Sequence, residues 1–322
     1  MDRRGLLAGC IGLSSWLAAN RAFAQSGPLT RIVYPFAAGG GGDTFCRLLA
    51  EHLRTLLDRP IIVENRTGAD GLIGIKSAMN ANPDGTTILV TTGPTMYLLP
   101  MMETKPSYDL GRDFVPVSLL GRFEFGIVTG AGADAKDFAQ LVAWLKANPA
   151  KASFGVPSNG TIPHFAGAHL EQKLGIPMTR VPYRGGAPVV KDLIGGHLPF
   201  AILALTDAIP QHRAGGVRVL AVSSRQRSPF LPDVPTLSES GVDLVADAWY
   251  GMWLPAGGSA EFARQLSAAV ATVLAKPEVK EKLLAIGLIP VGSTPEELSH
   301  ELAANTAFWQ PIVKATGYKI TN

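Results

Sequence analysis

Cysteine is scarce in this chain, which has two cysteines in 322 residues, Cys10 and Cys46. Cys10 lies in an N-terminal segment that we expect to be removed, so Cys46 would then have no intramolecular disulfide partner. Because Cys46 falls in a segment with helical periodicity, we predict that it is a small, buried hydrophobic residue. The sequence therefore excludes a fold held together by disulfides.

Charge is also sparse, at 17% of residues against 47% hydrophobic residues, a balance that is too apolar for a disordered chain. The length suits one large domain or two modest ones. Without the three arginines and one aspartate of the first 24 residues, the 29 basic and 26 acidic residues become 26 and 25. Affinity for nucleic acids depends on neutralising phosphates, so we expect no nucleic-acid partner.

Long hydrophobic runs are absent after residue 24, where no segment reaches about 18 uninterrupted apolar residues, so we predict a soluble mature protein. The N-terminus is typical of an export signal, with Arg3-Arg4, a modestly apolar stretch and the small-x-small sequence Ala22-Phe23-Ala24. We therefore predict cleavage after Ala24 and a periplasmic location.

Two alternatives for export stay open. The paired arginines resemble the start of a twin-arginine signal, so the general and twin-arginine routes are not distinguished. Leu7-Ala8-Gly9-Cys10 resembles a lipoprotein cleavage box, in which Cys10 would be lipidated. Only residues 5–9 would then form the apolar segment, which is shorter than usual, so soluble export is favoured.

Strands and helices alternate along the chain. Short apolar runs at 31–36, 61–63 and 87–91 predict strands, and periodic segments between them predict helices. The same alternation returns from residue 138 onward. This spacing indicates parallel βαβ units, and the predicted fold class is α/β.

Two segments are candidates for connections between lobes, Val117–Val128 and Leu244–Leu254. If the chain crosses there, residues 25–125 and 247–322 form a discontinuous first lobe. Residues 126–246 then form the second lobe.

The densest glycine run is Gly39–Gly42, which lies between a predicted strand and a predicted helix with Asp43 as its N-cap. Free N–H groups at such a helix start can bind a carboxylate or a phosphate. No Gly-Lys-Ser/Thr follows, and Thr44 stands where a dinucleotide motif needs its third glycine. We therefore interpret the loop as an anion site without nucleotide specificity.

Two further polar loops follow predicted strands, Ser158–Thr161 and Tyr183–Pro188. The carboxyl ends of parallel strands are where open α/β sheets bind ligands, so both loops are candidates for the same site. Arg184 in the second loop could pair with a carboxylate or could be a solvated surface residue.

Catalytic and metal-binding patterns are weak. The six histidines include no His-x-x-x-His pair, and Val156 occupies the position of the first glycine of a nucleophile elbow around Ser158. We therefore expect no metal, no cofactor and no catalysis. An exported hydrolase with Ser158 as nucleophile and His164 as base stays the alternative.

Several motifs, taken in order, resemble one known family. They are Val33–Phe36 with the Gly39–Asp43 loop, Val63–Ala69, Asn82–Thr86, Val181–Pro188, Leu231–Thr236 and Gly292–Glu297. Over essentially the whole mature chain, the sequence resembles the substrate-binding receptors of tripartite tricarboxylate transporters, the Bug family. The resemblance implies a two-lobed, type II-like periplasmic binding protein that closes on a small organic carboxylate. Its partners would be the membrane subunits of the transporter, and we expect a monomer.

The resemblance and the loop positions together give a set of candidate ligand-binding residues. These are Phe36, Ala38, Gly39, Gly40, Gly41, Asp43, Thr92, Gly93, Ser158, Asn159, Gly160, Thr161, His164, Arg184, Gly185, Gly186, Ala187 and Leu203. The sequence departs from the family in the first loop, where Ala37-Ala38 and Gly41-Gly42 replace prolines and hydroxyl residues. Pro199 and Leu203 stand where the family often has aspartates. An apolar Leu203 near the cleft would favour an aromatic or short aliphatic carboxylate.

Overall fold

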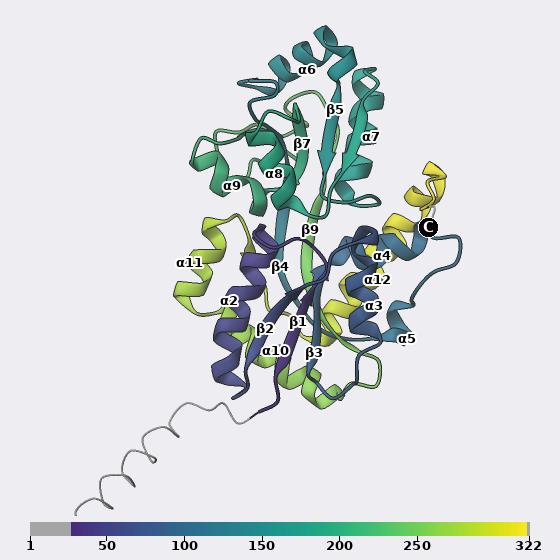
Figure 1. Cartoon of the computed structure of the whole chain (residues 1–322), viewed down its shortest axis with the longest axis vertical. Helices are drawn as coiled ribbons and strands as arrows, with labels where there is room; N and C mark the ends of the chain where they lie inside the picture. The colour runs from purple at the N-terminus through teal and green to yellow at the C-terminus, as the bar shows by residue number, and fades with distance from the viewer. Residues whose placement is uncertain (1–26, 321–322) are drawn as a thin grey trace, which may run out of the picture.

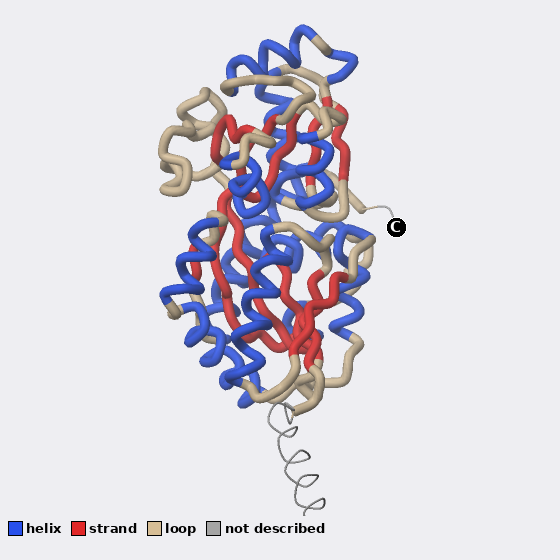
Figure 2. Tube along the Cα trace, turned by 60° about the vertical axis from the view of Figure 1, so that its left-hand side comes forward, coloured by secondary structure: helices blue, strands red, loops and turns tan. Residues whose placement is uncertain are grey.

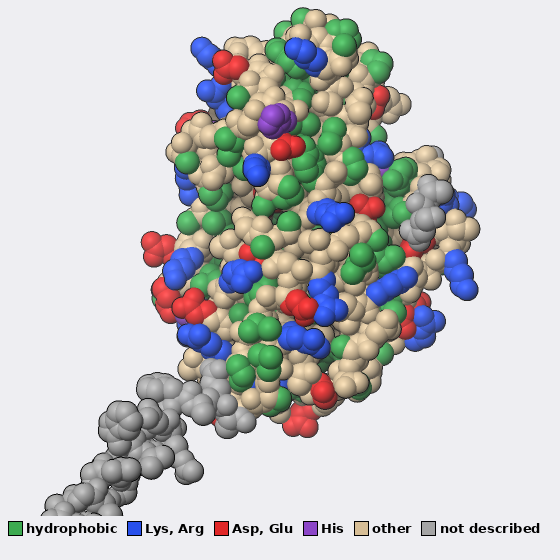
Figure 3. All heavy atoms as spheres, viewed as in Figure 1, with side chains coloured by type: hydrophobic (Ala, Val, Ile, Leu, Met, Phe, Trp, Pro, Cys, Tyr) green, Lys and Arg blue, Asp and Glu red, His purple; other side chains and the backbone are tan. Residues whose placement is uncertain are grey.

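The computed structural model describes residues 27–320, which form two lobes joined by a narrow waist (Figure 1). The predicted export signal, its cleavage site and Cys10 lie outside the described residues. Within residues 27–320, no helix is both long and apolar enough to cross a membrane. On the face shown in Figure 3, acidic and basic side chains are intermixed.

The first lobe contains strands β1–β4, β9 and β10 and most of the helices. The strands are β1 (Thr30–Tyr34), β2 (Ile61–Asn65), β3 (Thr87–Thr92), β4 (Phe114–Thr129), β9 (Asp247–Pro255) and β10 (Ile289–Pro290). The helices are α2 (Gly41–Leu56), α3 (Leu72–Met79), α4 (Gly93–Met102), α5 (Leu110–Asp113), α10 (Ala260–Leu274), α11 (Pro277–Ala285) and α12 (Pro295–Thr316).

The second lobe contains β5 (Ser153–Val156), β6 (Thr179–Pro182), β7 (Phe200–Ala204), β8 (Arg218–Val222), α6 (Phe138–Ala147), α7 (Ile162–Leu174), α8 (Gly186–Ile194) and α9 (Leu205–Arg213). Strand β1 pairs in parallel with β2 and β3, and β5 pairs in parallel with β6 and β7. The predicted α/β class with parallel units is therefore confirmed. Strands β4 and β9 add antiparallel pairs that the sequence did not indicate.

Strand β4 belongs to both lobes. It pairs with β9 over Phe114–Glu124 and with β7 from Phe125 onward, so one sheet continues through the waist in the order β2-β1-β3-β9-β4-β7-β5-β6. Figure 2 shows its tube running from one lobe into the other. We propose the division of the chain at residues 125 and 247 because the partners of β4 change at this point.

Helix α2 illustrates how the sequence forms the elements around the cleft. Its apolar stripe buries Phe45, Leu49 and Leu53 completely, and the predicted burial of Cys46 is confirmed. The helix begins at Gly41 with Gly40 as its N-cap, so the prediction that Asp43 is the N-cap was wrong. Asp43 lies in the first turn, where its carboxylate accepts a hydrogen bond from the Gly39 N–H at 2.9 Å.

Candidate ligand-binding cleft

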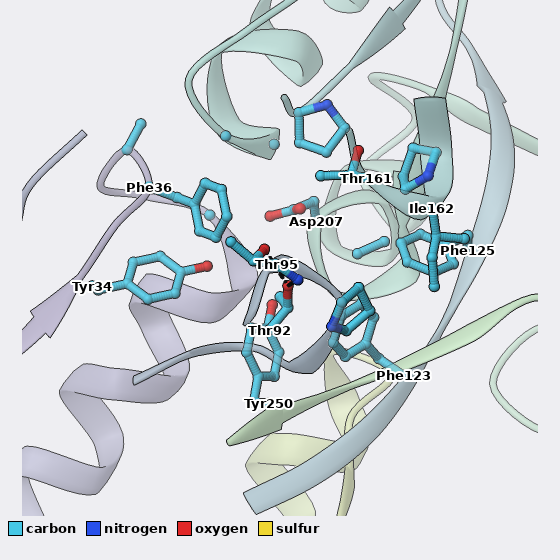
Figure 4. Close-up of a pocket in the computed structure, with 18 residues that line it drawn as sticks. Tyr34, Phe36, Thr92, Thr95, Phe123, Phe125, Thr161, Ile162, Asp207 and Tyr250 are labelled. Carbon is cyan, nitrogen blue, oxygen red and sulfur yellow. Dashed lines mark hydrogen bonds between the residues drawn. The ribbon is translucent and has the colours of Figure 1, made fainter. Parts of the chain in front are cut away.

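A cavity lies between the two lobes (Figure 4). The empty space in and around it, counting the part that opens to solvent, is about 560 Å³. Its lining residues come from both lobes and from the crossing strands. They are Tyr34, Phe36, Ala37, Gly40, Thr92, Pro94, Thr95, Phe123, Phe125, Pro157, Thr161, Ile162, Pro163, Gly185, Gly186, Ala204, Asp207 and Tyr250.

Aromatic rings form much of the cavity wall. Phe123 and Phe125 lie on β4, with ring centroids 5.5 Å apart, and Phe123 packs against Tyr250 of β9 at 4.6 Å. Tyr34 and Phe36, at the end of β1, are 5.5 Å apart in an edge-to-face arrangement. These contacts fix the rings in place and give the cavity an apolar surface that fits the carbon framework of a small ligand.

Four helices begin at the cavity. Gly40, Thr92, Thr161 and Gly185 are the N-cap residues of α2, α4, α7 and α8, and all four line it. The first N–H groups of a helix have no partner within the helix, and the helix dipole adds positive potential there. The cavity therefore offers backbone donors to an anion, although its described lining includes no lysine, arginine or histidine.

Asp207 is the single charged residue among the described lining residues. It lies in the first turn of α9, and its Oδ1 accepts a hydrogen bond from the Gly41 N–H across the cleft at 2.7 Å. Burial raises the pKa of this carboxyl to about 6, against the lowering effect of the Gly41 hydrogen bond. The carboxylate thus occupies the N-terminus of α2, where the sequence predicted a ligand anion.

Glycines let the Asp207 carboxylate lie close to the start of α8 in its own lobe and to the start of α2 in the other lobe. A Cβ atom on Gly186 would lie 2.0 Å from Asp207 Oδ2, and one on Gly40 would lie 2.7 Å from Oδ1. Real Cβ atoms do not approach so closely, so any side chain at Gly186 would force the carboxylate to move.

Two buried tyrosines lie behind Asp207. A Cβ atom on Gly42 would lie 2.0 Å from the Tyr34 hydroxyl and 2.8 Å from that of Tyr250, so both hydroxyls converge on the start of α2. Burial raises the pKa of Tyr34 and of Tyr250, and the Asp207 charge adds to the effect in both. Both phenols are therefore neutral at ordinary pH and provide hydrogen-bonding groups without charge.

The predicted site residues fall into three groups. Phe36, Gly40, Thr92, Thr161, Gly185 and Gly186 line the cavity. Gly39, Gly41 and Ala187 line a neighbouring surface pocket, and Ser158, Asn159 and Arg184 line another pocket between the lobes. Ala38, Asp43, Gly93, Gly160, His164 and Leu203 line none of these three pockets. A ligand contact for any of them stays a prediction.

Three of the residues outside the pockets have structural contacts instead. Burial alone would raise the pKa of Asp43, but hydrogen bonds from Arg47, Gly39 and Asn65 outweigh it and leave the pKa below its ordinary value. Leu203 is fully buried in the core of the second lobe, next to Ala204 of the cavity lining, so its influence on the ligand stays a prediction. Gly93 packs against the Trp249 indole.

The nucleophile and base of the hydrolase alternative bind other groups. Ser158 Oγ donates to the Asn159 carbonyl at 3.0 Å, and His164 Nδ1 accepts from the Gly160 N–H at 3.0 Å. His164 Nε2 faces Arg180, and burial followed by the Arg180 charge lowers the pKa of His164 to about 4. The described geometry therefore does not pair this serine with this histidine, as activation of a serine requires.

The sequence did not point to Asp207, Tyr34, Phe123, Phe125 or Tyr250 as site residues. A signal existed for Asp207, because it follows the apolar run of strand β7 just as the other loops follow their strands. For Phe123 and Phe125, the signal was their spacing of two on a crossing strand, which places both rings on one face.

The two lobes, the crossing strands and the cleft define a periplasmic binding protein, and solved structures of that class match the chain. BugD, a periplasmic binding protein, superposes with a TM-score of 0.84 and 30% identity over 90% of this chain and 98% of its own. The model of the tripartite tricarboxylate transporter family receptor matches residues 45–318, and the chain belongs to this family of periplasmic solute-binding receptors. The predicted family and fold class are confirmed.

Among curated relatives, a protein of Agrobacterium vitis from the TAR-I ttuE-ttuC' intergenic region is 34% identical over 94% of this chain and 88% of its own length. BugT of Bordetella pertussis is 30% identical over 98% and 97%. MatC of Rhodopseudomonas palustris with bound malate has a TM-score of 0.82 at 27% identity over 88% of this chain and 98% of its own. Rpa4515 of R. palustris with adipate has a TM-score of 0.83 at 28% identity over 90% and 98%.

Proposed function

We propose that this receptor captures a small carboxylate with an aromatic or short aliphatic framework and delivers it to the membrane subunits of a tripartite transporter. The observation that carries the proposal is the cleft itself, where helix N-termini and aromatic rings converge between two lobes. The R. palustris relatives hold malate and adipate, which supports a carboxylate ligand. The protein would act as a monomer in the periplasm after cleavage following Ala24.

Backbone groups would bind the carboxylate. Because the described lining has no basic side chain, we expect the first N–H groups of α4 and α7 to fill this role. Pro94 and Pro163, the second residues of these helices, have no N–H. The Thr95 N–H donates to Thr92 Oγ1. The framework of the ligand would lie against Phe36, Phe123 and Phe125. The aromatic walls thus support the apolar ligand that we predicted, on a different basis from Leu203.

Hydrogen bonds between the lobes would stabilise a closed receptor. Besides the Gly41–Asp207 bond, the Ala37 N–H donates to the Arg184 carbonyl at 2.8 Å. The Asn159 N–H donates to Asp70 Oδ1, also at 2.8 Å. Closure of two lobes around a ligand by bending at the connecting strands is a common way to bind solutes.

The test is a thermal-shift screen of the mature protein, from Gln25 onward, against mono-, di- and tricarboxylates and aromatic acids. A ligand at 100 times its Kd adds about 2.7 kcal/mol to the free energy of unfolding, which is readily measured. A saturable shift for one class of carboxylate supports the proposal. Absence of any shift with the folded protein would overturn it.

A further inference from the structure

The carboxylate of Asp207 has one satisfied oxygen and one open oxygen. Oδ1 accepts the Gly41 N–H, whereas Oδ2 accepts no hydrogen bond from any residue within 27–320. Asp207 is partly exposed, and Figure 4 shows its side chain pointing into the cavity between Phe36 and Thr161. The open oxygen is therefore available to a donor from a bound molecule.

Within residues 27–320, no basic side chain lines the cavity with Asp207 or forms an ion pair with it, and Lys191 lines the neighbouring pocket that Asp207 also borders. The Asp207 charge acts on the neighbouring Tyr34 and Tyr250, and burial raises the pKa of both phenols, so both are neutral at ordinary pH. A carboxylate enclosed among apolar rings without a counter-charge is costly to ionise. A ligand with a second carboxylate beside it would add repulsion between like charges.

Asp207 also occupies one of the backbone sites in the cleft that could bind an anion. It accepts the first N–H of α2, and its Oδ2 lies against the start of α8 at Gly186. The starts of α4 and α7, where Thr92 and Thr161 line the cavity, have no such internal anion. The cleft thus has one end with two helix N-termini that no protein carboxylate occupies and one acidic end.

We propose that the cleft selects zwitterionic acids, whose carboxylate binds at the starts of α4 and α7 while an ammonium group at the other end pairs with Asp207. This inference rests on the proposed function and specifies its ligand class. Asp207 is then the specificity-determining residue, because its carboxylate forms an ion pair with the ligand and not with another residue of the protein. Charge-assisted N–H···O bonds of this kind are among the stronger hydrogen bonds in proteins.

The experiment uses calorimetry at pH 8 to compare two sets of ligands, each with three compounds of one carbon framework. The first set is 6-aminohexanoate, adipate and hexanoate, and the second is 4-(aminomethyl)benzoate, terephthalate and 4-methylbenzoate. We expect the amino acid of a set to bind about 10-fold or more tightly than the other two, which corresponds to about 1.4 kcal/mol. In Asp207→Asn this preference should fall by a similar factor.

Asp233→Asn is the matched control, because Asp233 is exposed and the substitution changes the net charge equally. A second measurement needs no variant. At pH 5 Asp207 is largely protonated while the neighbouring phenols do not change, so the preference for the amino acid should shrink.

The possible outcomes test the ligand class and the receptor function separately. If the dicarboxylate or the plain acid binds best, or if the preference survives both Asp207→Asn and pH 5, the inference is wrong and the receptor function stands. If no member of either set binds, and no other carboxylate does, the proposed function fails together with the inference.

Discussion

Gly93 lies so close to the indole ring of Trp249 that a Cβ atom built on Gly93 would be 2.3 Å from Trp249 Cε2. Gly93 begins α4 directly after β3, and Trp249 lies on the neighbouring strand β9. The first residue of this helix therefore has to be glycine if the buried ring is to keep its place.

Gly93→Ala should destabilise the protein by about 1–3 kcal/mol, because overpacking of a fixed ring forces the ring or the helix to move. Denaturant unfolding followed by tryptophan fluorescence measures the change. The control is Gly111→Ala, since a Cβ atom there meets its nearest atom at 3.6 Å. Equal stability of the two variants would show that the close contact between Gly93 and Trp249 does not limit the side chain at position 93.

Asp207→Asn should stabilise the ligand-free protein at pH 8 and not at pH 4. The folded protein raises the pKa of Asp207 from 3.8 to about 6, so it binds this proton more tightly than the unfolded chain. The resulting stability is fully present below pH 3.8 and is lost as the pH rises through 6. Asparagine is neutral at every pH and avoids the loss, so the variant should gain about 1–3 kcal/mol at pH 8. Unfolding curves at several pH values measure this gain in the free energy of unfolding. A gain that does not depend on pH would show that it does not come from the ionisation of Asp207.

Gly186→Ala should weaken ligand binding by about 10-fold or more, because its Cβ atom would collide with the Asp207 carboxylate of the same lobe and displace it from the Gly41 N–H of the other lobe. Calorimetry with the best ligand of the screen measures the loss. A double-mutant cycle with Asp207→Ala provides the control, since the same alanine should cost less where the carboxylate is gone. Additive effects of the two substitutions would show that they do not share one contact.

Asp70→Gly should speed ligand release several-fold. Asp70 has a left-handed backbone with φ of +54°, which glycine adopts easily, so the substitution removes the acceptor of the Asn159 N–H without straining the turn. Stopped-flow dissociation measures the rate. Asp70→Asn keeps a side-chain oxygen and tolerates the left-handed region, so it should release ligand at nearly the normal rate. A fast rate in both variants would show that the carboxylate charge matters more than the hydrogen bond.

Local features of the cleft were predictable from the sequence. The glycine run after the first strand, the polar loop at 158–161 and the loop at 183–188 all lie at the carboxyl ends of parallel strands, where the α/β pattern predicted them. Thr161 and Gly186 line the cavity as expected. These residues were found because strand, loop and helix follow one another directly in the chain.

Contacts between distant parts of the chain were not predictable in the same way. Gly41 and Asp207 are 166 positions apart, and nothing in either neighbourhood indicates that one would be the hydrogen-bond partner of the other. Asp43 was assigned as an N-cap because of its type and place, but Gly40 takes that position and Asp43 pairs with Arg47. Such choices depend on which side chains tertiary packing brings together.

Strand β4, which the two lobes share, affects how the protein unfolds. The first part of β4 pairs with β9 in one lobe, and its last part pairs with β7 in the other. Unfolding of either lobe therefore removes a strand partner from the sheet of the other lobe. The two lobes should therefore melt together in a single transition. The energy of a bound ligand would then protect the far ends of the molecule as much as the cleft.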